Sequence, residues 1–268
     1  MSADTVLPTP RLLAQAEGSI GWMIFNNPEK RNALSLDMWA GIPAILDRFE
    51  RDPVIRVVVL RGAGEEAFIS GADISEFAKV RASPEQIAHY DKVSETAVAR
   101  IQSCPKPTLA MIHGFCIGGG VGVALSCDLR LAAESGRFGI PAARLGVSYR
   151  WTDIKKLMDL VGPADTKEIF YTARHFDAVE AKEMGLVNRV LPVAQLEAYT
   201  RDYCAKIAEN APLTISATKG VIAELLKPAS EIDRARCADL VKQCFASEDY
   251  IEGRRAFVEK RKPVFKGK

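Results

Sequence analysis

The sequence predicts an α/β fold with largely parallel strands, and three observations support this prediction. Residues 54–60 form a β-branched, nearly all-apolar run, which is typical of a strand covered on both faces. Residues 67–74 and 107–128 each join an apolar run to a glycine-containing turn, and helical sequence follows both turns. This alternation of strands and helices favours parallel strand pairing.

The composition is that of an ordinary globular protein. The chain has 268 residues, of which 48% are hydrophobic and 26% are charged. This length accommodates one large domain, or one domain with a C-terminal appendage. The formal net charge is +2, so no strong field favours nucleic acid or a membrane as a partner. The basic run within residues 254–268 fits either a solvated tail or attraction of an anionic ligand or neighbouring subunit.

The cysteines indicate a reducing compartment. There are 6, without a Cys-x-x-Cys pair and without histidines at metal-ligand spacing. We therefore expect a cytoplasmic protein with no metal site. Residues 1–10 have neither the basic start nor the apolar core of a secretory signal, and no run is long enough to span a bilayer.

The first elements follow from apolar spacing. Residues 19–25 are predicted as a strand, and a polar, cationic turn follows at residues 30–33. Ser35 is placed to cap the next helix, with Asp37 in its first turn. One face of this helix is apolar, through Trp39, Ile42, Leu46 and Phe49. Residues 75–103 look helical but polar, which fits a mobile or ligand-adjacent region.

The central stretch, residues 107–128, predicts a strand, a turn at Gly118, Gly119 and Gly120, and then a helix. Glycines there expose the first N–H groups of the helix, whose dipole favours a phosphate, a carboxylate or a developing oxyanion. The alternative is a turn that only lets the helix pack closely on the strand. A dinucleotide fingerprint is excluded because its third glycine position is Val123.

The last third of the chain is mostly helical. A strand is predicted at residues 128–133 and a further one at residues 187–191. Helices are predicted at residues 178–184 and 195–209, each with a stop signal at its end. We therefore divide the chain into a core, residues 1–195, and a C-terminal helical region, residues 196–268.

Six segments together carry a resemblance to a known family. They read NPEKRNAL at 27–34, SGADI at 70–74, GFCIGGG at 114–120, FGIP at 138–141, AKEMGLV at 181–187 and FVEKRKP at 257–263. These motifs resemble those of the crotonase family, also called the enoyl-CoA hydratase/isomerase superfamily. The resemblance implies a spiral of β-β-α units with a C-terminal helical trimerisation region, and often a hexamer made of two trimers.

The resemblance also implies an acyl-CoA thioester as substrate and no tightly bound cofactor, because coenzyme A is part of the substrate. The backbone N–H groups of Ala72 and Gly119 would form the oxyanion hole, and a helix N-terminus at Gly119 agrees with that role. The expected binding residues are Lys30, Arg31, Ala33, Ser70, Asp73, Ile74 and Gly118. For Lys30 and Arg31 an exposed basic turn is the equal alternative.

The chain departs from the hydratase pattern at the two positions where that pattern has glutamates. Gly122 and Ala142 occupy them, and neither can transfer a proton. Tyr149 is a candidate hydrogen-bond donor, and Asp153 is either a displaced acid or base or, as we favour, a cap of the helix starting near residue 154. Arg150 either pairs with a carboxylate on the acyl group or lies on the surface.

We therefore expect an acyl-CoA-binding enzyme that stabilises a thioester enolate. Decarboxylation, isomerisation or hydrolysis is favoured over efficient hydration, because the carboxylate pair is missing. Two alternatives stand beside it: a non-catalytic acyl-CoA-binding protein, and an enoyl-CoA hydratase with displaced catalytic groups.

Overall fold

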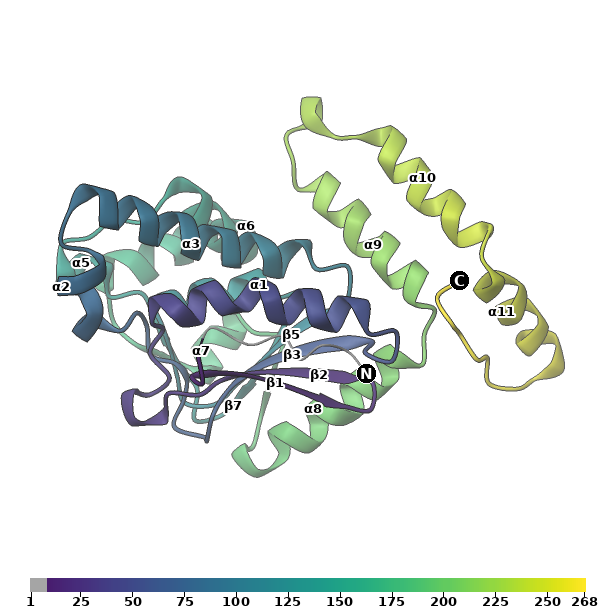
Figure 1. Cartoon of the computed structure of the whole chain (residues 1–268), viewed down its shortest axis with the longest axis horizontal. Helices are drawn as coiled ribbons and strands as arrows, with labels where there is room; N and C mark the ends of the chain where they lie inside the picture. Colours follow the sequence, from purple (N-terminus) through teal and green to yellow (C-terminus); the bar gives the residue numbers. More distant parts are fainter. Residues whose placement is uncertain (1–8) are drawn as a thin grey trace.

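Two sheets form the core of the protein, which we describe for residues 9–268 from a computed structural model (Figure 1). The larger sheet has the strand order β1-β2-β3-β5-β7-β10. Only β1 is antiparallel to its neighbour, and the other pairs are parallel. Its strands are β1 (Leu12–Glu17), β2 (Ile20–Phe25), β3 (Val57–Gly62), β5 (Thr108–Ile112), β7 (Leu129–Ala133) and β10 (Arg189–Leu191).

The smaller sheet has the order β4-β6-β8-β9, in which the first three strands are parallel and β9 is antiparallel to β8. It consists of β4 (Ala67–Ile69), β6 (Phe115–Ile117), β8 (Arg137–Gly139) and β9 (Phe176–Asp177). From β3 to β8, consecutive strands alternate between the two sheets, and a helical segment follows each pair. The chain therefore forms the expected spiral of β-β-α units, and the prediction of mainly parallel pairing is confirmed.

Helices cover both faces of the larger sheet (Figure 1). The long α1 (Leu36–Arg51) and α3 (Pro84–Ser103) pack on each other on one side, above a large apolar cluster. On the opposite face α8 (Val193–Ala208) packs through Leu196 and Cys204, which are fully buried with strand residues such as Val57. Because this burial removes apolar surface from water on both sides, the central strands carry near-continuous apolar sequence.

The other helical segments are η1 (Pro28–Lys30), η2 (Ile74–Glu76), α2 (Phe77–Val80), α4 (Gly119–Ser126), α5 (Ala142–Leu145), α6 (Trp151–Thr172), α7 (Ala178–Glu183) and η3 (Ala229–Glu231). The long α6 is interrupted by non-helical dihedral angles at Gly162, which precedes a proline. The helix predicted at residues 178–184 is confirmed as α7. Asp177 and Glu180 form a complete capping box at its start.

The sequence prediction differs from the structure in three strands. It gave no strand for residues 12–17, which form β1, and none for the two-residue β9. It also treated residues 107–117 as one strand, whereas Gly114 with φ +52° separates β5 from β6. A side chain at Gly114 would lie 1.8 Å from the Glu66 carbonyl oxygen, so glycine is required for this crossing between sheets.

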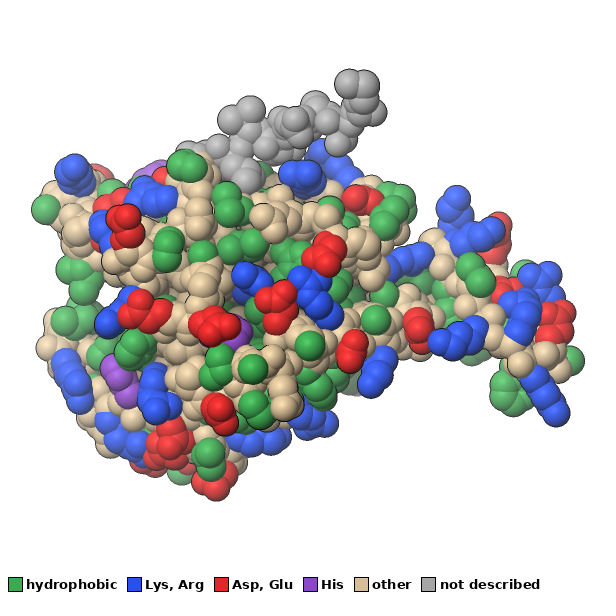
Figure 2. All heavy atoms as spheres, turned by 90° about the horizontal axis from the view of Figure 1, so that it is seen from below, with side chains coloured by type: hydrophobic (Ala, Val, Ile, Leu, Met, Phe, Trp, Pro, Cys, Tyr) green, Lys and Arg blue, Asp and Glu red, His purple; other side chains and the backbone are tan. Residues whose placement is uncertain are grey.

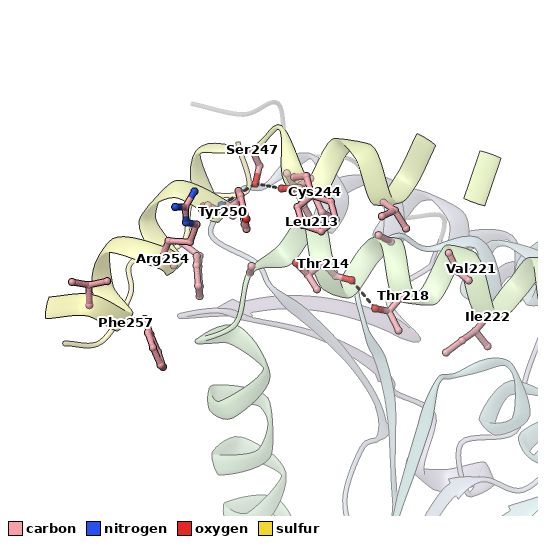
Figure 3. Close-up of a pocket in the computed structure, with 18 residues that line it drawn as sticks. Leu213, Thr214, Thr218, Val221, Ile222, Cys244, Ser247, Tyr250, Arg254 and Phe257 are labelled. Atoms are coloured by element: carbon pink, nitrogen blue, oxygen red, sulfur yellow. Dashed lines mark hydrogen bonds between the residues drawn. The ribbon is translucent and has the colours of Figure 1, made fainter. Parts of the chain in front are cut away.

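The last three helices form an arm that extends from the core (Figure 1). They are α9 (Pro212–Leu225), α10 (Arg234–Phe245) and α11 (Glu248–Glu259). A groove between them is lined largely by apolar side chains from Ala211 to Phe265, and Figure 3 shows 18 of its residues, ten of them labelled. The C-terminal segment returns to the core, where Arg56 donates a 3.0 Å hydrogen bond to the Phe265 carbonyl. The division at residue 195 stays a prediction, although α8 crosses it and packs on the larger sheet.

Candidate active site

Two backbone turns meet where two parallel strands of the smaller sheet end. Strands β4 and β6 are neighbours, with Ile69 paired to Cys116. The turn after β4 contains Ala72, and the turn after β6 contains Gly119. A side chain at Gly120 would lie 2.3 Å from the Ile69 carbonyl oxygen, so the start of α4 abuts the end of β4. Parallel strands therefore bring both turns to the same edge of the sheet.

The N–H group of Ala72 points away from Leu34, the residue with which Ala72 forms an isolated β-bridge. Leu34 donates to the Gly71 carbonyl and accepts from the Asp73 N–H, both at 2.8 Å, which forms a parallel bridge with Ala72. In such a bridge the flanking residues make the hydrogen bonds, so the N–H of the central residue faces the other side. Ala72 is half-buried, and its N–H is therefore available to a ligand.

Gly119 is the first residue of α4, where N–H groups have no acceptor within the helix. Gly118 precedes it with φ +53°, and the Gly118 N–H is used by the Gly139 carbonyl at 2.9 Å. A methyl group at Gly119 would lie 3.7 Å from Leu34, the same residue that bridges Ala72. Leu34 is therefore hydrogen-bonded to the turn after β4, and its side chain lies next to the turn after β6.

Tyr149 lies next to this pair of turns. A methyl group at Gly118 would be 3.4 Å from the Tyr149 hydroxyl oxygen. The ring packs edge-on against Phe170, with centroids 5.3 Å apart. Burial raises the pKa of the Tyr149 hydroxyl to about 12, with a further contribution from the charge of Asp153. The phenol therefore keeps its proton at neutral pH, so it can donate a hydrogen bond or a proton but cannot accept a proton as a base.

The two positions without glutamate have different surroundings. Gly122 is half-buried on α4, and a side chain added there would meet no atom within 4 Å. Ala142 is the first residue of α5 and belongs to the large apolar cluster, with 5% of its surface exposed. Neither position carries a group that exchanges protons.

Asp153 does not cap a helix that starts near residue 154, and that expectation is wrong. Helix α6 starts at Trp151, with Arg150 in the N-cap position. The Asp153 carboxylate, in the first turn, accepts from Arg150 Nε at 3.0 Å and lies 3.8 Å from Lys156 Nζ. Arg150 also lies 3.5 Å from Glu95 on α3, so it joins two helices. Asp153 and Arg150 are therefore both already paired with groups of the protein itself.

The cationic turn at residues 30–33 and the turn after β4 lie side by side. Lys30 Nζ donates to Asp73 at 2.8 Å and to Ser75 at 2.7 Å. Burial raises the pKa of the Asp73 carboxyl, but hydrogen bonds from Lys30 and Ser75 outweigh it, so the pKa is lowered overall. Asp73 is therefore ionised and holds the two turns together.

The other expected binding residues lie along the same two turns. Arg31 donates to Glu66 at 2.6 Å and lies over the Phe115 ring at 4.9 Å. Its backbone carbonyl accepts from the Ser70 N–H at 3.1 Å, whereas Ala33 is buried and Ile74 is 62% exposed. The structure therefore places the seven expected binding residues in the turn at residues 30–33, in the turn after β4, or at the start of α4.

Sequence reasoning missed three side chains that line this region. Trp39 of α1 lies 3.6 Å from the position of a methyl group at Gly119, and its Nε1 donates to the Tyr90 hydroxyl at 3.0 Å. Arg81 stacks on Tyr90, with its Cζ 3.9 Å from the ring centroid. Trp39 had been identified only as part of an apolar face. Tyr90 and Arg81 lie in the polar helical stretch, where the spacing of residues gave no signal of a site.

Other kinds of site were sought in the same structure. Within residues 9–268 there is no group of three His, Cys, Asp or Glu residues arranged to hold a metal ion. No helix in the described part of the chain is long and apolar enough to cross a membrane. Figure 2 shows basic and acidic side chains interspersed over one face of the molecule, in keeping with a net charge of only +2.

The fold and the two turns define a class of protein: an α/β spiral with a backbone site suited to an anionic oxygen. The family model described as enoyl-CoA hydratase/isomerase matches residues 15–268, and the chain belongs to this family. A short-chain-enoyl-CoA hydratase of Clostridium acetobutylicum is 31% identical, over 94% of this chain and 95% of that protein. A peroxisomal Δ(3,5)-Δ(2,4)-dienoyl-CoA isomerase of Arabidopsis thaliana is 32% identical, over 93% of both.

Solved structures agree with this assignment. An enoyl-CoA hydratase/carnithine racemase from Magnetospirillum magneticum superposes with a TM-score of 0.93, at 38% identity over 97% of both chains. A putative enoyl-CoA hydratase/isomerase family protein from Hyphomonas neptunium gives a TM-score of 0.93 at 34% identity, over 98% of this chain and all of that one. These relatives include both hydratases and isomerases by name, so family membership does not select one reaction.

Proposed function

We propose that the protein is an acyl-CoA enzyme that stabilises a thioester enolate with the backbone N–H groups of Ala72 and Gly119. The observation that carries this proposal is that both turns leave one edge of the smaller sheet, with Leu34 bridged to Ala72 and next to Gly119, and that the N–H groups of Ala72 and Gly119 are unused. Donors fixed in advance at a helix N-terminus are worth most where charge develops during the reaction.

Coenzyme A, as part of the substrate, lies against the two neighbouring turns. Lys30 and Arg31 supply positive charge for its phosphates, and the backbone around Ser70 and Ile74 contacts the adenine. The exposed position of Ile74 supports this arrangement, as do the Lys30 and Arg31 side chains, which are 47% and 55% exposed although they pair with Asp73 and Glu66. In this arrangement the phosphates compete with those carboxylates for the two cations. Ala33, Asp73 and Gly118 hold the backbone in place, through the ion pair and the hydrogen bonds described above.

The reaction is a decarboxylation, an isomerisation or a hydrolysis rather than efficient hydration. Hydration needs one group to accept a proton while another donates, and Gly122 and Ala142 can do neither. Tyr149 is the donor in this proposal, because its protonated phenol lies beside Gly118. In a decarboxylation the bond to the leaving carboxylate breaks, its electron pair forms the enolate, and the phenol proton goes to the α-carbon.

A panel of acyl-CoA esters, including malonyl-type esters, tests this function. Each ester is incubated with the protein and followed by mass spectrometry, and the mass change of a product identifies the reaction. We expect turnover of at least one ester and hydration of crotonyl-CoA with a kcat below about 1 s⁻¹. Faster hydration would favour the hydratase with displaced groups, which the names of the relatives also suggest. Tight binding with no product would favour a non-catalytic binding protein.

We also propose a homotrimer, or a hexamer of two trimers, in a cytoplasmic setting. The apolar groove between α9, α10 and α11 supports the assembly, because such a surface is normally covered. All 6 cysteines are unpaired, which is usual for a reducing compartment.

A further inference from the structure

Arg81 is a cation whose hydrogen-bonding capacity is largely unused. Its Nε is buried without a hydrogen-bond partner among residues 9–268. Its nearest ion-pair contact, with Asp91, has an N–O distance of 3.6 Å, which is longer than a hydrogen bond. A guanidinium carries five N–H donors, and leaving buried ones unpaired costs free energy.

Two aromatic rings hold this guanidinium in a fixed position. Its Cζ lies 3.9 Å from the centroid of Tyr90 and 4.9 Å from that of Phe77. Arg81 also closes α2, where its N–H donates to the Phe77 carbonyl at 2.8 Å. Stacking leaves the edge of the guanidinium, which carries the donors, free to meet a planar acceptor such as a carboxylate.

Arg81 is connected to the proposed oxyanion hole through Tyr90, on which it stacks, and then through Trp39. The Tyr90 hydroxyl accepts from Trp39, and Trp39 lies against Gly119. The charge of Arg81 also acts on Tyr149, because it lowers the pKa of that hydroxyl and so opposes the effect of burial. Trp39 and Tyr90 therefore link the position proposed for the thioester oxygen to this cation.

Arg150 is already used, because it donates to the Asp153 carboxylate at 3.0 Å and to the Asp91 carbonyl at 3.3 Å. Arg81 and Lys156 each have only a longer carboxylate contact, at 3.6 Å and 3.8 Å. Arg81 differs from Lys156 in its buried, unpartnered Nε and in the two rings that fix its guanidinium. We propose that Arg81 binds a carboxylate on the acyl group, so that the substrate is an acyl-CoA ester of a dicarboxylic acid. This inference rests on the proposed function and specifies its substrate class.

Matched pairs of thioesters test the inference through binding. Malonyl-, succinyl- and glutaryl-CoA are compared with propionyl-, butyryl- and pentanoyl-CoA, which have the same number of acyl carbons but end in a methyl group. Dissociation constants are measured by calorimetry. We expect at least one acidic ester to bind about tenfold or more tightly than its partner, as a charge-assisted hydrogen bond provides.

Variants then assign the preference to one residue. Arg81→Met is expected to abolish the difference within the pair, by weakening the acidic ester far more than the methyl-terminated one. Lys79→Met removes an exposed cation of the same helix and is expected to keep the difference. Arg81→Lys keeps the charge but not the planar fork, so it is expected to keep part of the preference, and it replaces Arg81→Met if that variant does not fold.

The outcomes separate the two proposals. Equal binding within every pair, or a preference that survives in Arg81→Met, overturns the role of Arg81 while the acyl-CoA site stands. A wild-type protein that binds none of the six esters contradicts the proposed function itself, and the inference with it.

Discussion

At the residue scale, the proposed chemistry depends on backbone groups more than on side chains. Ala72 offers its N–H because both flanking residues bond to Leu34, and Gly119 offers its N–H because it is the first residue of α4. The side chain with a transferable proton beside Gly118 is the phenol of Tyr149. A site of this kind stabilises negative charge well but abstracts a proton poorly.

Replacing Tyr149 by Phe tests the proposed proton donor. The substitution removes only the hydroxyl and keeps the edge-on contact with Phe170. We expect kcat for the ester identified in the panel to fall by about 10²-fold or more, the usual contribution of a positioned acid. The melting temperature is the control and should stay close to that of the wild type. An unchanged kcat would remove Tyr149 from the mechanism.

Neighbouring glycines of α4 are expected to respond oppositely to alanine. Gly120→Ala places a methyl group 2.3 Å from the Ile69 carbonyl, and such overpacking costs about 1–3 kcal/mol. Gly122→Ala meets no atom within 4 Å and should stabilise the helix by about 0.5–1 kcal/mol. Urea unfolding of both variants measures the difference. Similar effects would mean that Gly122 does not face open space.

At the element scale, much of the architecture could be predicted because short-range patterns decide it. The apolar runs at β3 and β5, the stop at Gly185 and the glycines before α4 all act locally, and each prediction agrees with the structure. Strand β1 was not predicted, because all but one of its residues are exposed or half-buried and no apolar alternation marks it. The start of α6 was misplaced because an N-cap is set by backbone angles, and Arg150 is an uncommon cap residue.

The site was only partly predictable for a different reason. The two glycine turns can be recognised from their composition. Contacts between three separate elements, by contrast, bring together Trp39, Tyr90 and Arg81. A single sequence carries no signal for such contacts. The same holds for the Arg150 and Asp153 pair, whose partners lie on α3 and α6.

The ion pair between the two turns predicts a pH dependence of stability. Asp73 has a lowered pKa in the folded protein, so its contribution is present at neutral pH and is lost as pH falls through that folded value. We expect Asp73→Asn to cost about 1 kcal/mol at pH 7, with the difference from wild type shrinking below about pH 4. Denaturant unfolding across that range measures it. A difference that is independent of pH would mean that the charge of Asp73 is not responsible.

At the scale of the whole molecule, the helical arm is the feature that the isolated chain leaves least covered. Ile222, Phe245 and Phe257 are 52%, 62% and 85% exposed on α9, α10 and α11. The basic C-terminal run is less free than its sequence suggests, because Arg255 and Arg261 both pair with Glu252. This pairing reduces the charge available to an anionic ligand or a neighbouring subunit, so apolar contact is the better basis for assembly.

Light scattering after size exclusion tests the assembly. We expect a mass three or six times that of one chain for the wild type. Ile222→Glu combined with Phe245→Glu places two charges on exposed apolar positions and should lower the mass, because burying unpaired charges in an interface is costly. Exposed Lys242→Glu on α10 serves as the control. A monomeric wild type would contradict the proposed trimer.

The most direct test of the account compares two substitutions of Gly119 that differ in one hydrogen-bond donor. Alanine keeps the N–H, and its methyl group would make ordinary contacts at 3.6 Å with Trp39 and 3.7 Å with Leu34. Proline removes the N–H at a first helical position, where its ring is tolerated. We expect Gly119→Pro to lose about 10²–10³-fold in kcat and Gly119→Ala to stay within about tenfold of wild type. If Gly119→Pro turns over as fast as Gly119→Ala, the backbone oxyanion hole is wrong.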